Sequence, residues 1–196
     1  MRKGEATRQA ILDEAVHAAR HTGLSGLTIG TLAERTGLSK SGLYAHFRSK
    51  EALQLDTMRH NREQFIGEVL RSALASPRGE ARLRTLVARW IRWYHHPGGC
   101  LFLASATEFD DFPGPLHDQM VSDVSDLQDS LTQIIDTLVS TGDVRADTDT
   151  DQVAQEVLGI LLAFNWAWRF LKHDEAERRA WTALDRLLTS LRPDES

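Results

Sequence analysis

Apolar residues recur along nearly the whole chain at intervals of three and four positions, which places them on one face of an α-helix. The segment 116–138 shows this spacing most clearly and stops near Gly142. No segment shows the two-residue alternation that is typical of a half-buried β-strand. The pattern therefore predicts an all-α protein.

The predicted helices are short near the N-terminus and long elsewhere. After an apolar stripe at Ile11–Ala19, helix starts follow closely at Thr28, Ser39 and Ser49, because each of these side chains can accept a hydrogen bond from a first-turn amide. Gly37 predicts a stop between the first two. Three stops and starts thus fall within about two dozen residues.

The last two helices are predicted from capping-box spacings. Asp149 with Gln152 opens one, and Asp174 with Glu177 opens the other. Between residues 157 and 170 the first of them is apolar on nearly all sides, which indicates burial on more than one face, including against a second subunit.

The segment 28–47 has the plan of a helix-turn-helix motif. A helix of about eight residues, a turn with Gly37 and a second short helix match this arrangement, whose second helix enters the major groove of DNA. The apolar residues expected to lock the helices together are Leu32, Ala33, Leu38, Leu43 and Phe47. The residues left outward on the second helix are Lys40, Ser41, Gly42, Tyr44, Ala45 and His46.

The outward residues suit contacts with DNA. Lys40 and His46 can donate hydrogen bonds to guanine or phosphate, and the Ala45 methyl group can touch a thymine methyl group. Small residues such as Ser41 and Gly42 permit close approach to the bases. Free amides at helix starts, or a hydroxyl group, make further phosphate candidates of Thr28, Ser39, Tyr44 and Lys50.

Each of these assignments has a plainer alternative. The segment 28–47 could be a pair of structural helices within a bundle, and His46 could face solvent without touching DNA. Tyr44 could pack against the first helix, and Lys50 could be an ordinary surface lysine.

Charge divides the chain of 196 residues. The net charge is −5, which by itself argues against a nucleic-acid partner. Residues 1–50, however, contain eight Lys or Arg and four Asp or Glu, whereas residues 51–196 contain fifteen and twenty-four. Between residues 101 and 151, twelve carboxylates accompany the single cation Arg145. DNA would be attracted to the N-terminal part and repelled by the rest.

Other classes are excluded by what the sequence lacks. No apolar run approaches the roughly 18 residues of a membrane span, and no signal segment is present, so we expect a cytoplasmic protein without a membrane partner. The single cysteine, Cys100, excludes a disulfide framework. His95 and His96 point to different sides of a helix, so neither a metal site nor a cofactor is expected. An enzyme would need a catalytic constellation, and none is found.

Residues from about 6 to 55 resemble the DNA-binding domain of TetR-family transcriptional regulators. The matching positions are Ile11–Ala15, Thr28, Ala33–Glu34, Gly37–Lys40, Leu43–Tyr44, Phe47 and Ser49–Leu53. The resemblance implies about nine helices, a DNA-binding domain at 1–50 and an effector-binding and dimerisation domain at 51–196. It also implies a homodimer through the last two long helices and a palindromic operator. One departure is Ser41, where the family commonly has glycine.

The resemblance further implies a small-molecule pocket between central helices. Aromatic side chains there suit an apolar or aromatic effector, with Asn165 and Glu108 as polar anchors if they face inward, although the same residues could simply form core or dimer interface. The candidates are Trp90, Trp93, Tyr94, Phe102, Phe109, Phe112, Met120, Phe164, Asn165 and Trp168.

The sequence thus predicts a DNA-binding transcriptional regulator, a repressor that a small effector releases from its operator. The helix beginning near Ser49 is expected to connect the two sites. The alternative is a helical small-molecule-binding module that does not bind DNA.

Overall fold

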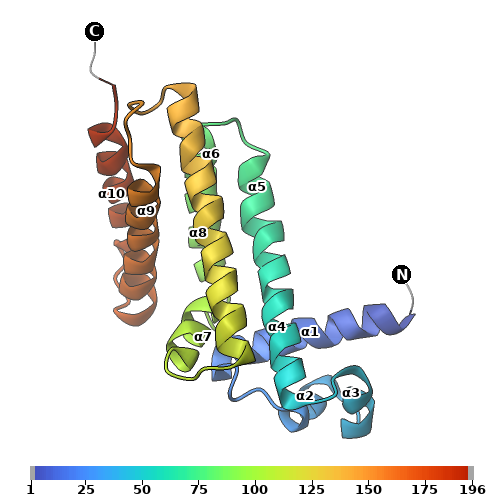
Figure 1. Cartoon of the computed structure of the whole chain (residues 1–196). Helices are drawn as coiled ribbons and strands as arrows, with labels where there is room; N and C mark the ends of the chain where they lie inside the picture. Colours follow the sequence, from blue (N-terminus) through green and yellow to red (C-terminus); the bar gives the residue numbers. More distant parts are fainter. Residues whose placement is uncertain (1–2, 194–196) are drawn as a thin grey trace. The chain divides into compact units, whose positions relative to one another are not determined.

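The computed structural model describes residues 3–193, and every regular element in this range is a helix (Figure 1). In chain order the elements are α1 (Lys3–Thr22), α2 (Ile29–Thr36), α3 (Lys40–His46), α4 (Lys50–Phe65), η1 (Ile66–Leu70), α5 (Arg71–Leu74), α6 (Glu80–Tyr94), α7 (Leu101–Phe109), α8 (Pro115–Thr141), α9 (Thr150–Asn165), η2 (Trp166–Phe170) and α10 (Ala176–Ser190).

Two π-helical turns continue the helices before them. The turn η1 joins α4 to α5, and η2 extends α9. Counted as continuous rods, the described residues form nine helices, which confirms the predicted all-α fold. Among these residues, no helix combines the length and apolarity needed to cross a membrane.

The backbone forms two compact units. The first contains the described residues up to Phe65 together with 96–124, and the second contains 66–95 together with the described residues from 125 onward. The first unit therefore combines the N-terminal part of the chain, which has the closely spaced helix starts, with the segment 96–124, although thirty residues of the second unit lie between them in the sequence. The division at residue 50 into a DNA-binding domain and an effector-binding and dimerisation domain stays a prediction.

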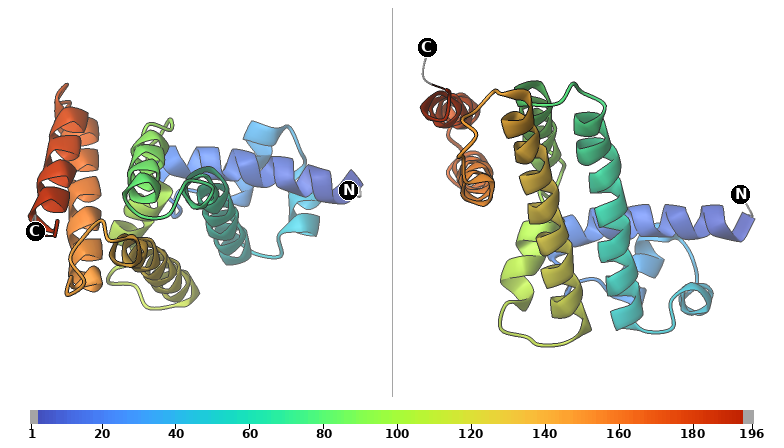
Figure 2. Two further views of the ribbon diagram at one scale, coloured as in Figure 1. Left: turned by 90° about the horizontal axis from the view of Figure 1, so that it is seen from above. Right: turned by 45° about the horizontal axis from the view of Figure 1, so that its top comes forward.

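In the first unit, α1 crosses α4 and also contacts α2 and α7 (Figure 2). Its apolar stripe is buried, with Ala15 and Ala19 fully inaccessible. Polar pairs add to this apolar contact with α4. Arg8 of α1 forms a 2.6 Å ion pair with Asp56 of α4, and His60 Nε2 of α4 lies 2.7 Å from Asp13 Oδ1 of α1.

In the second unit, α9 packs against α6 on one side and α10 on the other, and α9 and α10 (orange and red) lie side by side in Figure 2. The Asp149 side chain accepts a 3.0 Å hydrogen bond from the Gln152 amide and caps α9, as predicted. The corresponding prediction for Asp174 is wrong. The helix α10 begins one residue later, after Glu175, and has no side-chain cap.

Candidate nucleic-acid interface

Two short helices, α2 and α3, form the helix-turn-helix, and side-chain caps define where each begins. Thr28 Oγ1 accepts from the Thr31 amide at 3.1 Å, and Thr31 Oγ1 accepts from the Thr28 amide at 3.1 Å. Ser39 Oγ accepts from the Gly42 amide at 3.1 Å and caps α3. The predicted starts at Thr28 and Ser39 are therefore confirmed, and they satisfy amides that have no partner within the helix.

The turn between the two helices depends on Gly37. This residue ends α2 with φ +69°, in the left-handed region that a side chain disfavours. Leu32, Leu43 and Phe47 close the core between the helices, each at most 1% exposed. Leu38 was expected there too, but it is 38% exposed because it lies in the turn and on neither helix.

One face of α3 is left open. Lys40, Ser41, Tyr44 and Ala45 are exposed, and Tyr44 keeps 54% of its surface, so packing against α2 does not occupy it. The predicted outward residues Gly42 and His46 are half-buried. The ring of His46 lies 6.2 Å from that of Phe47.

Thr28 and Lys40 converge at the N-terminus of α2. A methyl group added at Gly30 would lie 3.6 Å from Thr28 Oγ1 and 4.0 Å from Lys40 Nζ, so both side chains lie beside Gly30 in the first turn of α2. An ammonium group beside a helix N-terminus forms a suitable place for a phosphate. Both residues are predicted DNA contacts from the sequence, but only the fold shows that they lie near each other.

Arg48 is a further cation that the sequence reasoning missed. It is exposed between α3 and α4, and its position in that short connection was the signal that could have identified it. Neither Arg48 nor Lys40 forms an ion pair with any residue in the range 3–193. Both charges are therefore available to an outside anion.

Lys50 has a partner within the chain. At the start of α4, its Nζ donates a 2.7 Å hydrogen bond to the carbonyl oxygen of Ser25, in the connection between α1 and α2. Ser49 Oγ caps α4 by accepting from the Ala52 amide at 3.0 Å. One of the three ammonium donors of Lys50 is thus used internally, and its role as a phosphate contact stays a prediction.

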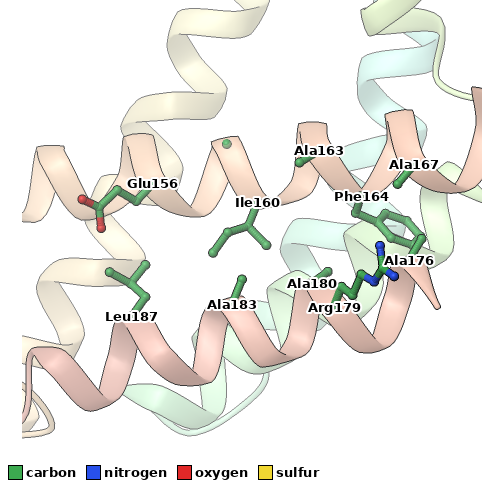
Figure 3. Close-up of a pocket in the computed structure, with 11 residues that line it drawn as sticks. Glu156, Ile160, Ala163, Phe164, Ala167, Ala176, Arg179, Ala180, Ala183 and Leu187 are labelled. Atoms are coloured by element: carbon green, nitrogen blue, oxygen red, sulfur yellow. The ribbon is translucent and has the colours of Figure 1, made fainter. Parts of the chain in front are cut away.

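An apolar groove runs between α9 and α10 in the second unit, with a volume of about 520 Å³ (Figure 3). Ile160 and Ala183 face each other near its middle. Small residues form most of its wall, so a second helix could approach closely. The lining residues are Glu156, Gly159, Ile160, Ala163, Phe164, Ala167, Ala176, Arg179, Ala180, Ala183 and Leu187.

Three of the predicted pocket residues meet in the second unit. The Phe164 ring lies 6.2 Å from the rings of both Tyr94 and Trp168, and His95, which was not predicted, lies 4.3 Å from Trp168. Asn165 follows on α9, and its Oδ1 is buried without a hydrogen bond to the described residues. Phe164 also lines the groove. Two further candidates, buried on α6, are Trp90 and Trp93.

Four predicted pocket residues belong to the first unit. Phe102 meets Phe65 edge to face at 5.7 Å, a partner that helical spacing could not reveal. Met120 is buried and Phe109 is half-buried, whereas Phe112 is 67% exposed in the loop before α8. The ten candidates are thus divided between the two units, four in the first and six in the second, and their role as effector contacts stays a prediction.

Glu108, the other residue predicted as a polar anchor, has partners within the chain. Its carboxylate accepts hydrogen bonds from the backbone amides of Leu24 at 2.9 Å and Ser25 at 2.8 Å. These two residues lie between α1 and α2, so the Glu108 side chain contacts the helix-turn-helix part of the molecule.

Two family models match the chain. Residues 11–56 match the model described as bacterial regulatory proteins, tetR family, and residues 79–184 match the tetracyclin repressor-like C-terminal domain. The first match spans the helix-turn-helix with parts of α1 and α4. The second spans α6 to the middle of α10, including most of the groove.

Individual proteins agree with these matches. The HTH-type transcriptional regulator BetI of Burkholderia mallei is 33% identical over 85 residues, which cover 43% of this chain and 44% of BetI. The aligned part is thus under half the length of the curated relatives. A TetR-family transcriptional regulator from Cytophaga hutchinsonii superposes with a TM-score of 0.85 at 20% identity, covering 100% of this chain and 99% of that one. The structure of AibR in complex with isovaleryl coenzyme A and operator DNA superposes with a TM-score of 0.69 at 20% identity, covering 95% of this chain and 98% of AibR.

The turn of the motif yields a test of its backbone geometry. We expect Gly37→Ala to lower the free energy of unfolding by about 1 kcal/mol, because alanine resists the left-handed conformation even though nothing lies within 4 Å of its methyl group. Gly30→Ala is the control, since a methyl group there also fits but the backbone is helical; it should raise stability by about 0.5 kcal/mol. Urea unfolding at equal protein concentration measures both. Equal destabilisation of the two variants would contradict the role assigned to Gly37.

Proposed function

The chain belongs to the TetR family of bacterial transcriptional regulators, and we propose that it acts as a homodimeric repressor that binds a palindromic operator. A small apolar or aromatic effector would release it. The observation that carries the DNA-binding proposal is the open face of α3, with Lys40, Ser41, Tyr44 and Ala45 exposed on a motif whose core is closed.

The exposed face of α3 suits the major groove. The side chains of Ser41 and Ala45 are small, so the backbone of α3 can approach the edges of the bases. Lys40 can donate hydrogen bonds to guanine acceptors. Phosphates on either side would be bound at the start of α2, where Thr28 and Lys40 converge, and by Arg48. Ser39, Tyr44 and Lys50 are further phosphate candidates, and His46 is the remaining donor on α3.

Charge supports one docking orientation. The excess of cations in residues 1–50 attracts phosphate, whereas the twelve carboxylates between residues 101 and 151 repel it. A duplex would therefore meet α2 and α3 first, and non-specific binding through the acidic segments would be suppressed.

The surfaces of α9 and α10 support a homodimer. Their groove is lined mainly by small apolar residues, and large apolar side chains nearby are open to solvent: Trp166 is 60% exposed and Phe170 68%. Exposed apolar side chains close in sequence to an apolar groove are typical of an interaction site. A second copy placed symmetrically would cover it, and the dimer would hold two α3 helices about 34–36 Å apart, one turn of DNA.

The effector class is proposed from the aromatic residues. Tyr94, Phe164 and Trp168 meet in the second unit, and flat apolar side chains suit a flat or apolar ligand. AibR, which shares the fold, was crystallised with both an acyl coenzyme A and operator DNA, so this architecture can hold both kinds of partner. The effector would weaken DNA binding by preferring a conformation with a different spacing of the α3 helices.

Lys40 tests the DNA-reading proposal. With a duplex selected from a random pool by the wild-type protein, we expect Lys40→Ala to weaken binding by about 1–3 kcal/mol if Lys40 contacts a base, or to reduce the salt slope by about 1 if it contacts phosphate. Fluorescence anisotropy over a range of salt concentrations separates the two cases. Arg89→Ala, which removes an exposed cation on α6, is the control and should bind as the wild type.

Two results would contradict this proposal. Unchanged affinity and salt slope for Lys40→Ala would show that α3 is not the recognition helix. A wild-type protein that binds no duplex even at low salt would favour the DNA-free binding module instead.

The groove gives an independent test of the dimer. Ala183→Glu places a carboxylate at the middle of the groove, where burial without a partner is costly, so we expect the variant to be monomeric in analytical ultracentrifugation and to bind the operator more weakly. Thr189→Glu adds the same charge to an exposed position of α10 outside the groove and should remain dimeric. A dimeric Ala183→Glu variant would exclude the groove as the subunit interface.

A further inference from the structure

The connection between α1 and α2 is held by side chains from two other helices. Glu108, in the last turn of α7, accepts from the amides of Leu24 and Ser25, one with each carboxylate oxygen. Gln54 of α4 donates to the Leu24 carbonyl at 2.6 Å, and Lys50 of α4 donates to the Ser25 carbonyl at 2.7 Å. The backbone amide and carbonyl groups of these two consecutive residues are thus all bound by side chains of α4 and α7.

The Glu108 interaction is of a strong type. A carboxylate that accepts two amide hydrogen bonds at 2.8 and 2.9 Å combines charge with fixed two-point geometry. Leu24 itself is fully buried, as is Leu27 two residues after Ser25. The connection is therefore anchored to the core by its leucines and aligned by its peptide groups.

A second contact fixes α7 to the end of α1. Gly98, in the loop before α7, has φ +81°, and a Cβ atom there would lie 2.6 Å from the Cβ and 2.7 Å from the carbonyl carbon of Arg20. Only glycine permits this approach. The segment 98–108 therefore meets the chain at residue 20, near the end of α1, and again at residues 24 and 25.

The anchored connection leads directly into the helix-turn-helix. Thr28, the cap of α2 and a proposed phosphate contact, comes three residues after Ser25. A change in the position of α7 would pull on the amides of Leu24 and Ser25, and through them on the start of α2. The helix α4 acts on the carbonyls of the same two residues, so both helices influence the motif at one point.

We propose that Glu108 is a positioning residue for DNA recognition, which couples α7 to the helix-turn-helix through the amides of Leu24 and Ser25. This inference rests on the proposed function, because it assigns a consequence for operator binding. It adds to the expected route through α4 a second route from the segment 96–124, and the coupling is reciprocal: DNA that immobilises the motif also restrains α7.

The test uses hydrogen exchange of the full chain, with and without a duplex selected from a random pool by the wild-type protein. The first variant is Glu108→Ala, which removes both acceptor oxygens. The second is Glu108→Gln, which keeps the shape of the side chain and one acceptor oxygen, and it serves if Glu108→Ala folds poorly. Asp111→Asn is the matched control, since it removes a carboxylate from the exposed loop after α7, three residues from Glu108.

Without DNA, we expect exchange in residues 23–27 to become about tenfold faster or more in Glu108→Ala, less so in Glu108→Gln, and to stay unchanged in Asp111→Asn. With DNA, exchange in residues 101–109 should slow in the wild type and in Asp111→Asn, but not in either Glu108 variant. Operator affinity should fall about 5- to 150-fold in Glu108→Ala, the usual range of coupling between sites.

The sign of the affinity change separates positioning from charge. Removing a carboxylate by itself strengthens binding to a polyanion, so equal or tighter binding by the Glu108 variants would overturn the proposal. So would a DNA-dependent slowing in residues 101–109 that persists in those variants, or unchanged exchange in residues 23–27. If the wild type binds no duplex, the proposed function fails and the coupling to DNA with it, whereas binding without any response in α7 refutes the coupling alone.

Discussion

The helix-turn-helix depends on burial, because neither of its helices could persist alone. The helices α2 and α3 have eight and seven residues, well below the length at which an isolated helix is stable in water. The two helices pack against each other, and α2 also packs against α1. In this core the side chains of four leucines are fully inaccessible: Leu24, Leu27, Leu32 and Leu43. Everything presented on the open face of α3 is therefore positioned by that core.

Polar contacts refine what burial establishes. Apolar contact is non-directional, so small shifts of α1 against α4 change the free energy of this contact little. The Arg8–Asp56 ion pair and the contact of His60 with Asp13 restrict such shifts. Lys50 shows how one side chain can serve the same purpose at the motif itself: its ammonium group holds the connection before α2 and keeps two donors for another partner.

Charged and apolar surfaces are concentrated in different segments of the chain. Cations lie in the part with the short helices, where Lys40 and Arg48 stay exposed, and carboxylates accumulate in the helices that follow. The apolar groove of α9 and α10 is separate in sequence from both. The proposed DNA contact and the proposed subunit contact thus use surfaces of different chemistry, so neither would compete with the other.

Features that depend on near neighbours in the chain could be predicted without the fold: the helical periodicity, the caps at Thr28 and Ser39, the stop at Gly37 and four of the six outward residues of α3. Helical spacing shows that a side chain faces inward but not what it meets, since partners far apart in the chain are chosen by packing. Only the tertiary structure joined Phe65 to Phe102 and Tyr94 to Phe164. Only it placed Glu108 on amides more than eighty residues earlier, because a carboxylate accepts from any amide that the fold brings within reach.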